Sequence, residues 1–290
     1  MPIKFFMVGA TVEIFIADHA GFCFGVERAV SLVEDTSKQD TGVFTLGPII
    51  HNPQIVSKFA QNGVGVCDTP EEMNKDNTVV IRSHGVTKET YKKLDERQVK
   101  VVDATCPFVK KAQTSAKKLG DNNSIVVVYG EKDHPEVKSI VSFIDSEYII
   151  VSDVEEVNDL PYSKSYSLVA QTTQNSESFD KIAEILKTKC DELQINNTIC
   201  NATSLRQASA IELANKVDTM IVIGGKNSGN TTRLYKICSD ICPNVYHIET
   251  SEELNKEIFE DSRKVGITAG ASTPGYLVEE VIEFLKEVSK

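Results

Sequence analysis

The chain has 290 residues, of which 41% are hydrophobic and 25% are charged, proportions typical of a soluble globular protein. Its formal net charge of −11 argues against nucleic acid or an anionic membrane as the main partner, although a local pocket can still bind a small anion. No apolar run is long enough to span a membrane and no secretion signal is recognisable, so we expect a cytoplasmic protein. Its seven cysteines, an odd number, are then expected to be thiols and not a disulfide framework.

The first predicted element is a strand over residues 13–17. Residues 1–12 precede it as an N-terminal extension to which we assign no role. A repeat begins after this strand, and each of its copies opens with a cysteine. In the first copy, Cys23 precedes an amphipathic helix predicted over residues 25–38 and a strand over residues 43–46. Gly47 ends that strand 24 residues after the cysteine, and His51 follows four residues later.

The second and third copies keep this spacing of 24 and then four residues. The equivalent cysteine, glycine and polar residue are Cys106, Gly130 and His134 in the second copy, and Cys200, Gly224 and Ser228 in the third. Strands are predicted over residues 125–129 and 220–223. The buried stripe of the intervening helix is predicted to be Phe108, Ala112, Ala116 and Leu119 in the second copy, and Leu205, Ala208, Ile211 and Ala214 in the third.

Strands that alternate with helices indicate parallel α/β units. The repeat therefore predicts three α/β domains with parallel sheets, over residues 13–105, 106–199 and 200–290, related by a pseudo-threefold axis. Three thiolates that converge on such an axis could hold an iron–sulfur cube by three corners and leave the fourth iron open for chemistry.

Each cysteine also has a simpler interpretation, because a single thiol is usually an apolar core residue. A zinc site is the nearest alternative for the three repeated cysteines, but structural zinc prefers closely spaced cysteine pairs and four ligands, and no Cys-x-x-Cys occurs. The remaining cysteines lack repeat partners and are expected to be structural; they are Cys67, Cys190, Cys238 and Cys242.

Polar residues follow the predicted strands in all three copies. They are His51, His84, His134, Glu136, Thr172, Ser228, Asn230 and Ser272. Ligands of parallel α/β units bind beyond the carboxyl ends of the strands, where helix N-termini favour anions. Histidines, hydroxyls and an amide around one cavity suit a multiply charged anion such as diphosphate. Taken singly, the hydroxyls also have an alternative explanation as plain helix caps, and Glu136 as an ordinary first-turn acid.

Several segments together resemble the LytB/IspH family of 4-hydroxy-3-methylbut-2-enyl diphosphate reductases. The segments are Gly21-Phe-Cys-Phe-Gly-Val26, Asp103-Ala-Thr-Cys-Pro107, His134-Pro-Glu136, Gln171-Thr-Thr173, Asn227-Ser-Gly-Asn230 and Thr268-Ala-Gly-Ala-Ser272. The resemblance extends from about residue 13 to the C-terminus and implies three α/β domains arranged as a trefoil around a 4Fe–4S cluster. It further implies the last step of the methylerythritol phosphate route, the reduction of an allylic diphosphate to isopentenyl and dimethylallyl diphosphate.

The resemblance also implies roles for individual residues. The cluster ligands would be Cys23, Cys106 and Cys200, and the diphosphate-binding positions would be His51, His84, His134, Ser228, Gly229, Asn230 and Ser272. Glu136 matches the proton-delivery acid, and Thr172, or its neighbour Thr173, matches the hydroxyl that helps to hold the substrate alcohol. Gly229 is a departure, because the family usually has a second serine there, so we expect altered affinity without loss of function.

The chain contains no flavin or nicotinamide motif, so electrons are expected from an external ferredoxin or flavodoxin. These donors are usually acidic, and Lys110, Lys111, Lys117 and Lys118 are the candidates for a local basic patch. A monomer or a homodimer is expected. Two alternatives stay open: a cluster-based redox sensor or electron carrier, which would need a fourth cluster ligand, and a diphosphate-binding regulatory module without a cluster.

Overall fold

The computed structural model describes residues 4–8, 12–50, 52–122, 124–226, 228–259 and 262–288. Within these ranges the strands form one five-stranded and two four-stranded sheets with helices between them, and the predicted α/β class is confirmed. The chain divides into two compact units, one of residues 1–27, 51–55 and 201–290 and the other of residues 28–50 and 56–200. No helix of the described ranges has the length and apolar character needed to cross a bilayer.

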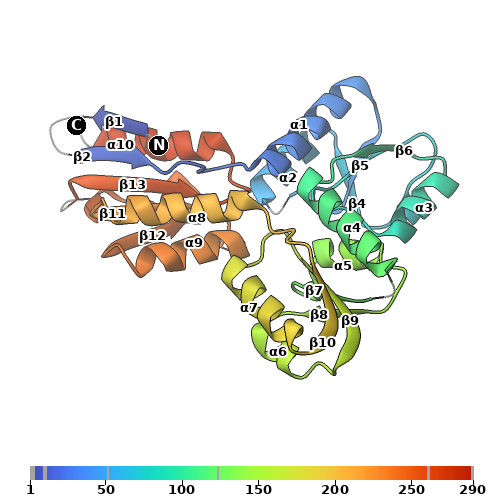
Figure 1. Ribbon diagram of the computed structural model, residues 1–290. Coiled ribbons are helices and arrows are strands. Elements are labelled where there is room, and N and C mark those ends of the chain that lie inside the picture. The colour runs from blue at the N-terminus through green and yellow to red at the C-terminus, as the bar shows by residue number, and fades with distance from the viewer. Residues whose placement is uncertain are drawn as a thin grey trace. The chain divides into compact units, whose positions relative to one another are not determined.

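The first unit contains the five-stranded sheet, in the order β1-β2-β13-β11-β12 (Figure 1). Its strands are β1 (Lys4–Val8), β2 (Val12–Ile16), β11 (Thr219–Ile223), β12 (Asn244–Ile248) and β13 (Lys264–Ala269). Its helices are α8 (Asn201–Ala214), α9 (Gly229–Ser239) and α10 (Gly275–Val288), with short 3₁₀ helices at Ser251–Glu253 and Lys256–Phe259. Neighbouring strands are parallel except β1 and β2, which are antiparallel.

The N-terminal strand differs from its expected place in the fold. The strand predicted over residues 13–17 is β2, and part of the unassigned extension forms β1 beside it, with Lys4 opposite Ile16. However, β2 pairs with β13, with Glu13 opposite Lys264, so it lies in the sheet of the third copy and not in that of the first. An apolar run predicts that a strand forms, but strand pairing across such a separation depends on tertiary packing.

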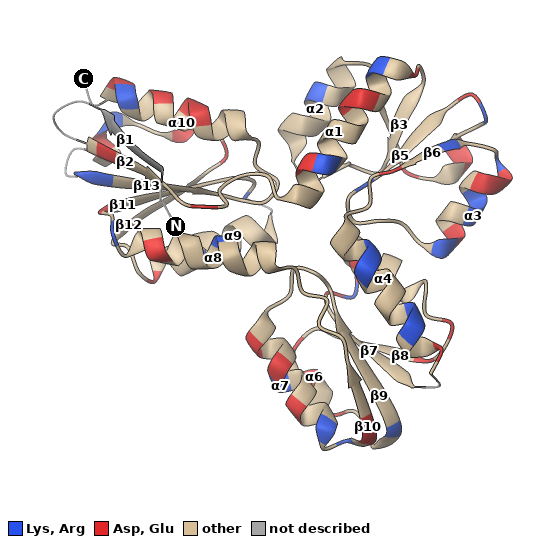
Figure 2. Ribbon diagram, turned by 45° about the horizontal axis from the view of Figure 1, so that its top comes forward, with Lys and Arg blue, Asp and Glu red and all other residues tan. Residues whose placement is uncertain are grey.

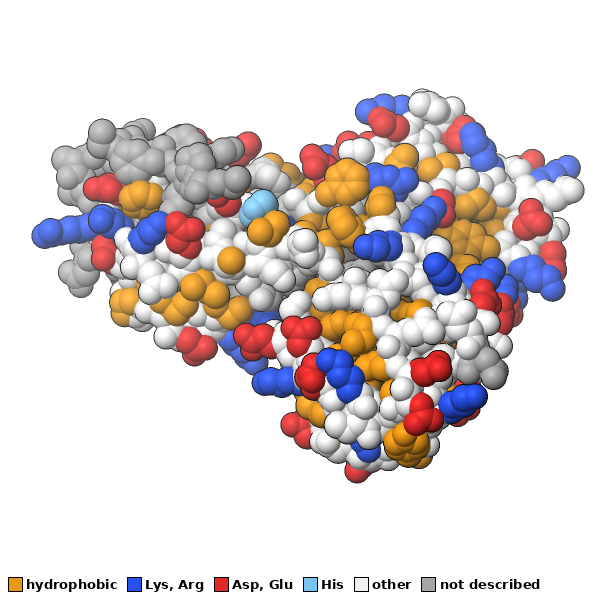
Figure 3. Space-filling model, in the orientation of Figure 1, with side chains coloured by type: hydrophobic (Ala, Val, Ile, Leu, Met, Phe, Trp, Pro, Cys, Tyr) orange, Lys and Arg blue, Asp and Glu red, His pale blue; other side chains and the backbone are white. Residues whose placement is uncertain are grey.

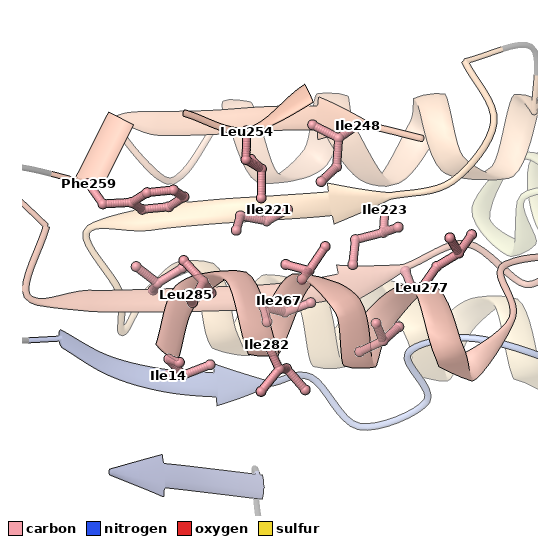
Figure 4. Packing of buried hydrophobic residues seen from close by; sticks show 14 of the residues in the cluster. Ile14, Ile221, Ile223, Ile248, Leu254, Phe259, Ile267, Leu277, Ile282 and Leu285 are labelled. Carbon is pink, nitrogen blue, oxygen red and sulfur yellow. The ribbon is translucent and has the colours of Figure 1, made fainter. Parts of the chain in front are cut away.

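Both faces of the central strands β11 and β13 are buried, which explains their nearly continuous apolar sequence. Ile221 and Ile223 of β11 point to one face, where they pack with Leu277 and Leu285 of α10 (Figure 4). The alternate residues Met220 and Val222 belong to a second cluster that includes Leu213 of α8 and Leu234 of α9. The period of two along the strand therefore assigns α10 to one face and α8 and α9 to the other.

The second unit contains two fully parallel sheets, in the orders β4-β3-β5-β6 and β10-β9-β7-β8. The first sheet has strands β3 (Val43–Leu46), β4 (Gly65–Cys67), β5 (Thr78–Ile81) and β6 (Lys100–Asp103), with helix α3 (Lys88–Glu96) and a 3₁₀ helix at Pro70–Glu72. Helices α1 (Phe24–Gln39) and α2 (Pro53–Gln61) contribute residues to both units. The second sheet has strands β7 (Ile125–Tyr129), β8 (Tyr148–Val151), β9 (Ser163–Ala170) and β10 (Cys190–Ile195), with helices α4 (Pro107–Gly120), α5 (Pro135–Val141), α6 (Val154–Asn158) and α7 (Ser176–Lys187).

Strand β7 again has two buried faces. Val127 and Tyr129 belong to the cluster that contains Phe179 of α7, whereas Val126 and Val128 belong to the cluster of α4 and α5. The predicted strands over residues 43–46 and 125–129 coincide with β3 and β7. The three-domain boundaries at 105/106 and 199/200 stay a prediction, and so does the trefoil arrangement of the domains.

Two predicted helix stripes were partly wrong. Ala112, Ala116 and Leu119 of α4 are buried, but Phe108 is 42% exposed because Val109 takes the core position in the first turn. In α8 the stripe is rotated by about one residue. Leu205, Ala208 and Ile211 are exposed, and the buried positions are Arg206, Ala210, Leu213 and Ala214. A buried arginine occupies the stripe, which hydrophobic periodicity cannot predict; its Nη2 donates a hydrogen bond of 2.8 Å to the Gly21 carbonyl.

Candidate functional site

A buried acid lies among the predicted site residues of the second unit. Glu136 stands in the first turn of α5 with 2% of its surface exposed, and it is the one acidic side chain that the fold buries among the described residues. Its Oε1 accepts a hydrogen bond of 2.6 Å from the Thr172 backbone N–H, and its Oε2 accepts one of 3.1 Å from the Thr172 hydroxyl. Burial raises the pKa of Glu136 to about 7, while both hydrogen bonds oppose that shift. A carboxyl group of this pKa can serve as a general acid at neutral pH.

The structure distinguishes Thr172 from Thr173, a choice that the sequence left open. Thr172 is buried just beyond the end of β9 and contacts Glu136 through both its N–H and its hydroxyl. Thr173 is exposed, and its hydroxyl accepts a hydrogen bond of 3.1 Å from Gln171 Nε2. Gln171 is itself held, because its Oε1 accepts a hydrogen bond of 3.0 Å from the Glu131 N–H.

Two of the predicted diphosphate-binding histidines lie side by side in this unit. His134 caps α5, and its Nδ1 accepts a hydrogen bond of 3.1 Å from the backbone N–H of Glu136. The ring of His84, in the loop after β5, lies 5.5 Å from the His134 ring in an edge-to-face arrangement at 83°. Gly85 follows with a φ of 73°, the left-handed region that favours glycine.

Cys106 and Cys200 both join this group through their backbones. The N–H of Cys106, at the start of α4, donates a hydrogen bond of 2.9 Å to the carbonyl of Ser83, the residue before His84. The N–H of Cys200 donates one of 2.8 Å to the carbonyl of Thr172. The second unit therefore brings together six of the predicted site residues: His84, Cys106, His134, Glu136, Thr172 and Cys200.

A second group of predicted residues lies in the first unit, at the start of α9. Ser228 caps this helix, and its hydroxyl accepts a hydrogen bond of 3.4 Å from the Thr231 N–H. Gly229 is exposed, and a Cβ added there would meet no atom within 4 Å. The Nδ2 of Asn230 is buried and has no hydrogen-bond partner among the residues that the structure describes, and the same holds for the Thr231 hydroxyl. A helix N-terminus with an unsatisfied buried donor fits an anionic ligand.

Cys23 and Ser272 lie close together in the same unit. The Cys23 N–H donates a hydrogen bond of 3.2 Å to the carbonyl of Ala271, the residue before Ser272. Asn52, which the sequence did not single out, donates from its Nδ2 to the Ser272 carbonyl over 3.0 Å and accepts from the Ile55 N–H over 2.9 Å. A polar residue directly before Pro53 at a helix start was the available signal for such a cap. His51 lies outside the described residues.

A buried hydrogen-bond network, also missed by the sequence, joins three segments that carry site residues. Gln113 of α4 donates from Nε2 to the Ser139 hydroxyl of α5 over 2.6 Å, and that hydroxyl donates to the Val86 carbonyl over 2.9 Å. A Cβ on Gly85 would lie 2.8 Å from Gln113 Nε2 and 2.9 Å from Ser139 Oγ, so the network requires glycine there. Isolated polar residues inside helices gave no sequence signal for this role.

The seven cysteines fall into two environments. Cys23, Cys106 and Cys200 are partly exposed, and each stands where a helix begins. The other four are buried, as expected of structural thiols, and burial raises the pKa of Cys67 to about 11 and that of Cys238 to about 12. The three repeated cysteines are thus the accessible thiols of the chain, and their role as metal ligands stays a prediction. No three histidine, cysteine or acidic side chains of the described ranges lie together as a metal site; Cys23 belongs to one unit, and Cys106 and Cys200 to the other.

The fold and the site define an α/β protein with three largely parallel sheets, in which a buried acid lies among histidines, partly exposed thiols and helix N-termini. Residues 14–286 match the LytB protein family, and the chain belongs to that family.

Curated relatives match along nearly the whole chain. A 4-hydroxy-3-methylbut-2-enyl diphosphate reductase of Geobacter sulfurreducens is 48% identical over 276 residues, which cover 95% of this chain and 98% of the relative. Proteins of the same name are 47% identical in Aquifex aeolicus, over 96% of this chain and 97% of the relative, and 46% identical in Syntrophotalea carbinolica, over 96% and 100%.

Solved structures show the same fold. One described as (E)-4-hydroxy-3-methyl-but-2-enyl diphosphate reductase, the terminal enzyme of the non-mevalonate pathway, is 46% identical with a TM-score of 0.79 and covers 97% of this chain and 100% of that one. The E-1-hydroxy-2-methyl-but-2-enyl-4-diphosphate reductase of Plasmodium falciparum has a TM-score of 0.85 at 24% identity, over 97% and 88% of the chains, and supports the fold alone.

Proposed function

We propose that this protein is a 4-hydroxy-3-methylbut-2-enyl diphosphate reductase, an oxidoreductase of the non-mevalonate route to isoprenoids. Two electrons and two protons convert the allylic alcohol diphosphate into isopentenyl or dimethylallyl diphosphate, and the hydroxyl group leaves as water. The observation that carries the proposal is the buried contact of Glu136 with Thr172, in a chain 46–48% identical to relatives of that name. A buried acid of raised pKa is the group that the departure of a hydroxyl requires.

We infer that Cys23, Cys106 and Cys200 hold one 4Fe–4S cluster with one iron open. These thiols are partly exposed and lie at helix starts, positions that fit such a cluster better than those of the four buried cysteines. When bound, the cluster supplies electrons and the Lewis acidity that weakens a carbon–oxygen bond.

The diphosphate of the substrate would be bound by the polar residues predicted for this role. The start of α9 offers the Asn230 amide and the Ser228 hydroxyl beside a helix dipole, and Ser272 adds a hydroxyl in the same unit. His84, His134 and His51 would supply further donors, and Gly229 a backbone N–H. Binding of the non-reacting diphosphate would orient the alcohol toward the acid.

Glu136 would deliver protons through the Thr172 hydroxyl. That hydroxyl lies 3.1 Å from Glu136 Oε2, so it can give its own proton to the leaving oxygen while it receives one from the carboxyl group. Burial of both side chains keeps bulk water from competing for the proton.

Electrons would come from an external protein, for which a ferredoxin or flavodoxin is our expectation. Helix α4 begins beside Cys106 and carries four lysines and no acidic residue (Figure 2). Lys110 is engaged with Asp103 at 2.7 Å, so Lys111, Lys117 and Lys118 form the basic patch proposed here. A monomeric or homodimeric state and a cytoplasmic location stay predictions.

Anaerobic turnover of the allylic diphosphate with a chemical reductant tests the function directly. Wild type should form both five-carbon diphosphates, and Glu136→Gln should lose at least about a hundredfold in kcat with an unchanged cluster, since general acids contribute that much. Thr172→Ala should be similarly impaired, and Thr173→Ala is the matched control that should stay near wild type. A wild-type protein that holds a cluster yet forms no product would contradict the proposal.

A Mössbauer spectrum separates the reductase from a sensor or electron carrier. One iron that differs from the other three and responds to added substrate is expected of the reductase. Four equivalent irons without a response to substrate would support the alternative.

A further inference from the structure

The segment Asp103-Ala104-Thr105 begins at the last residue of β6 and leads directly to Cys106. The main chain is already attached to neighbouring strand ends, because the Ala104 N–H donates to the Ile81 carbonyl over 3.2 Å and the Cys106 N–H to the Ser83 carbonyl over 2.9 Å. The sheet thus fixes where the segment lies. Side-chain contacts of Asp103 and Arg28 add to that attachment.

The Asp103 carboxylate binds groups on both sides of Cys106. Its Oδ1 accepts a hydrogen bond of 2.9 Å from the Thr105 N–H, one residue before the cysteine. Its Oδ2 lies 2.7 Å from Nζ of Lys110, one helical turn after the cysteine. The Tyr91 hydroxyl of α3 donates to the same oxygen over 3.0 Å. A carboxylate that bridges the residues before and after Cys106 restricts the backbone of the cysteine itself.

The Arg28 side chain of helix α1 forms hydrogen bonds with the same segment. Its Nη1 donates to the Thr105 carbonyl over 3.3 Å and its Nη2 to the Asp103 carbonyl over 3.2 Å. The planar guanidinium donates to the two carbonyls from two separate nitrogens held in a fixed plane, whereas a lysine would have to reach both from its single Nζ. Arg28 lies in α1, the helix that begins one residue after Cys23. Thr105 is 1% exposed, so its carbonyl depends on such a donor in place of water.

We propose that Asp103 and Arg28 are positioning residues that hold Cys106 in the geometry of a cluster ligand. Neither side chain has to touch the cluster. They restrain the residues on both sides of Cys106, so that the Cys106 side chain already has the orientation of a ligand before iron binds. The inference rests on the proposed function, because it requires Cys106 to be a ligand. Loss of such second-layer contacts commonly weakens metal binding by about 10- to 100-fold.

The test is the rate of iron loss to a ferrous chelator under anaerobic conditions, together with the melting temperature of the cluster-free chain. Asp103→Asn and Arg28→Gln should release iron about tenfold faster than wild type. Arg28→Lys keeps the positive charge but loses the paired hydrogen bonds from the two guanidinium nitrogens, and it should also release iron faster. The matched control is Lys100→Gln in the same strand, which removes the 2.7 Å ion pair with Asp40 and should change the release rate little.

A purely structural role would lower the melting temperature of the cluster-free variants without faster iron release relative to Lys100→Gln, and that result would overturn the inference. Faster release at a melting temperature equal to that of Lys100→Gln supports it. A wild-type protein that takes up no cluster would overturn the proposed function and this inference together, whereas normal turnover with unchanged release in all three variants would overturn the inference alone.

Discussion

Glu136 shows how burial raises the pKa of an acid in the first turn of a helix. The helix N-terminus and the two hydrogen bonds from Thr172 favour its carboxylate, yet removal from water outweighs them and raises its pKa to about 7. The sequence motif indicated this residue, but the raised pKa depends on β9 and α5 packing around it.

The raised pKa predicts how stability depends on pH. Between about pH 4.5 and 7, folded Glu136 keeps a proton that the unfolded chain has lost, so the folded state is destabilised as pH rises through this window. Relative to Glu136→Gln, wild type should lose up to about 3 kcal/mol across it and show a constant difference outside it. Urea unfolding of both proteins without substrate, from pH 4 to 8, measures the difference. Parallel stability curves would show that the carboxyl pKa is not raised.

Replacement of Gly229 by serine is predicted to improve substrate binding and not to weaken it. Its φ is not in the left-handed region and a Cβ has open space, so Gly229→Ser should fold normally. The new hydroxyl would stand between Ser228 and Asn230 at the start of α9, where a phosphate contact is expected, and should lower the KM severalfold. Gly229→Ala is the control, because it gains helix propensity of up to about 1 kcal/mol without a hydroxyl. Equal KM values for the two variants would contradict a phosphate contact at this position.

At the scale of elements, α4 combines a buried face that completes the core with an exposed basic face. Ala112, Ala116 and Leu119 face the sheet, while Lys111, Lys117 and Lys118 lie on the outside. Figure 3 shows basic and hydrophobic side chains together on the surface of the second unit around α4. The chain as a whole is acidic, so this basic patch differs in charge from the molecule's net charge. Its positive charge complements the surface of an acidic partner protein.

Reversal of the charge on α4 tests the docking of an electron donor. A Lys111→Glu, Lys117→Glu, Lys118→Glu variant should lose about tenfold or more in rate with ferredoxin or flavodoxin at low salt, since steering scales rates by at least that factor. Its rate with dithionite should equal that of wild type. The control reverses three other exposed lysines, Lys164, Lys181 and Lys236, and changes the net charge equally. Equal losses in both variants would show a general charge effect without docking at α4.

At the scale of the whole molecule, the seven cysteines form two classes that differ in burial, and the residues next to each cysteine in the sequence do not define these classes. Each repeated thiol is partly exposed at a helix start, one in each copy, whereas the four others fill cores. The 24-residue spacing to a glycine indicated this division, because equivalent positions of repeated units have equivalent surroundings.

Serine substitutions should therefore divide the cysteines into two classes. Ser at position 23, 106 or 200 removes a soft ligand, so Cys23→Ser, Cys106→Ser and Cys200→Ser should each lose most of the bound iron and sulfide after anaerobic reconstitution. Cys67→Ser and Cys238→Ser should keep the cluster and lose stability instead, because a hydroxyl replaces a buried thiol. Full iron content in any of the first three variants would remove that residue from the ligand set.

The sequence by itself determined the α/β class, strands β3 and β7, and the cysteine–glycine register, because apolar periodicity and spacing are local properties of the chain. Only the tertiary structure decided that β2 pairs with β13, that Arg206 lies on the buried face of α8, and that Thr172 and not Thr173 contacts Glu136. The same holds for the contacts of Asp103 with Tyr91 and of Arg28 with Thr105. Each of these depends on segments that are distant or ambiguous in sequence and meet only when the sheets pack, so no local pattern could specify them.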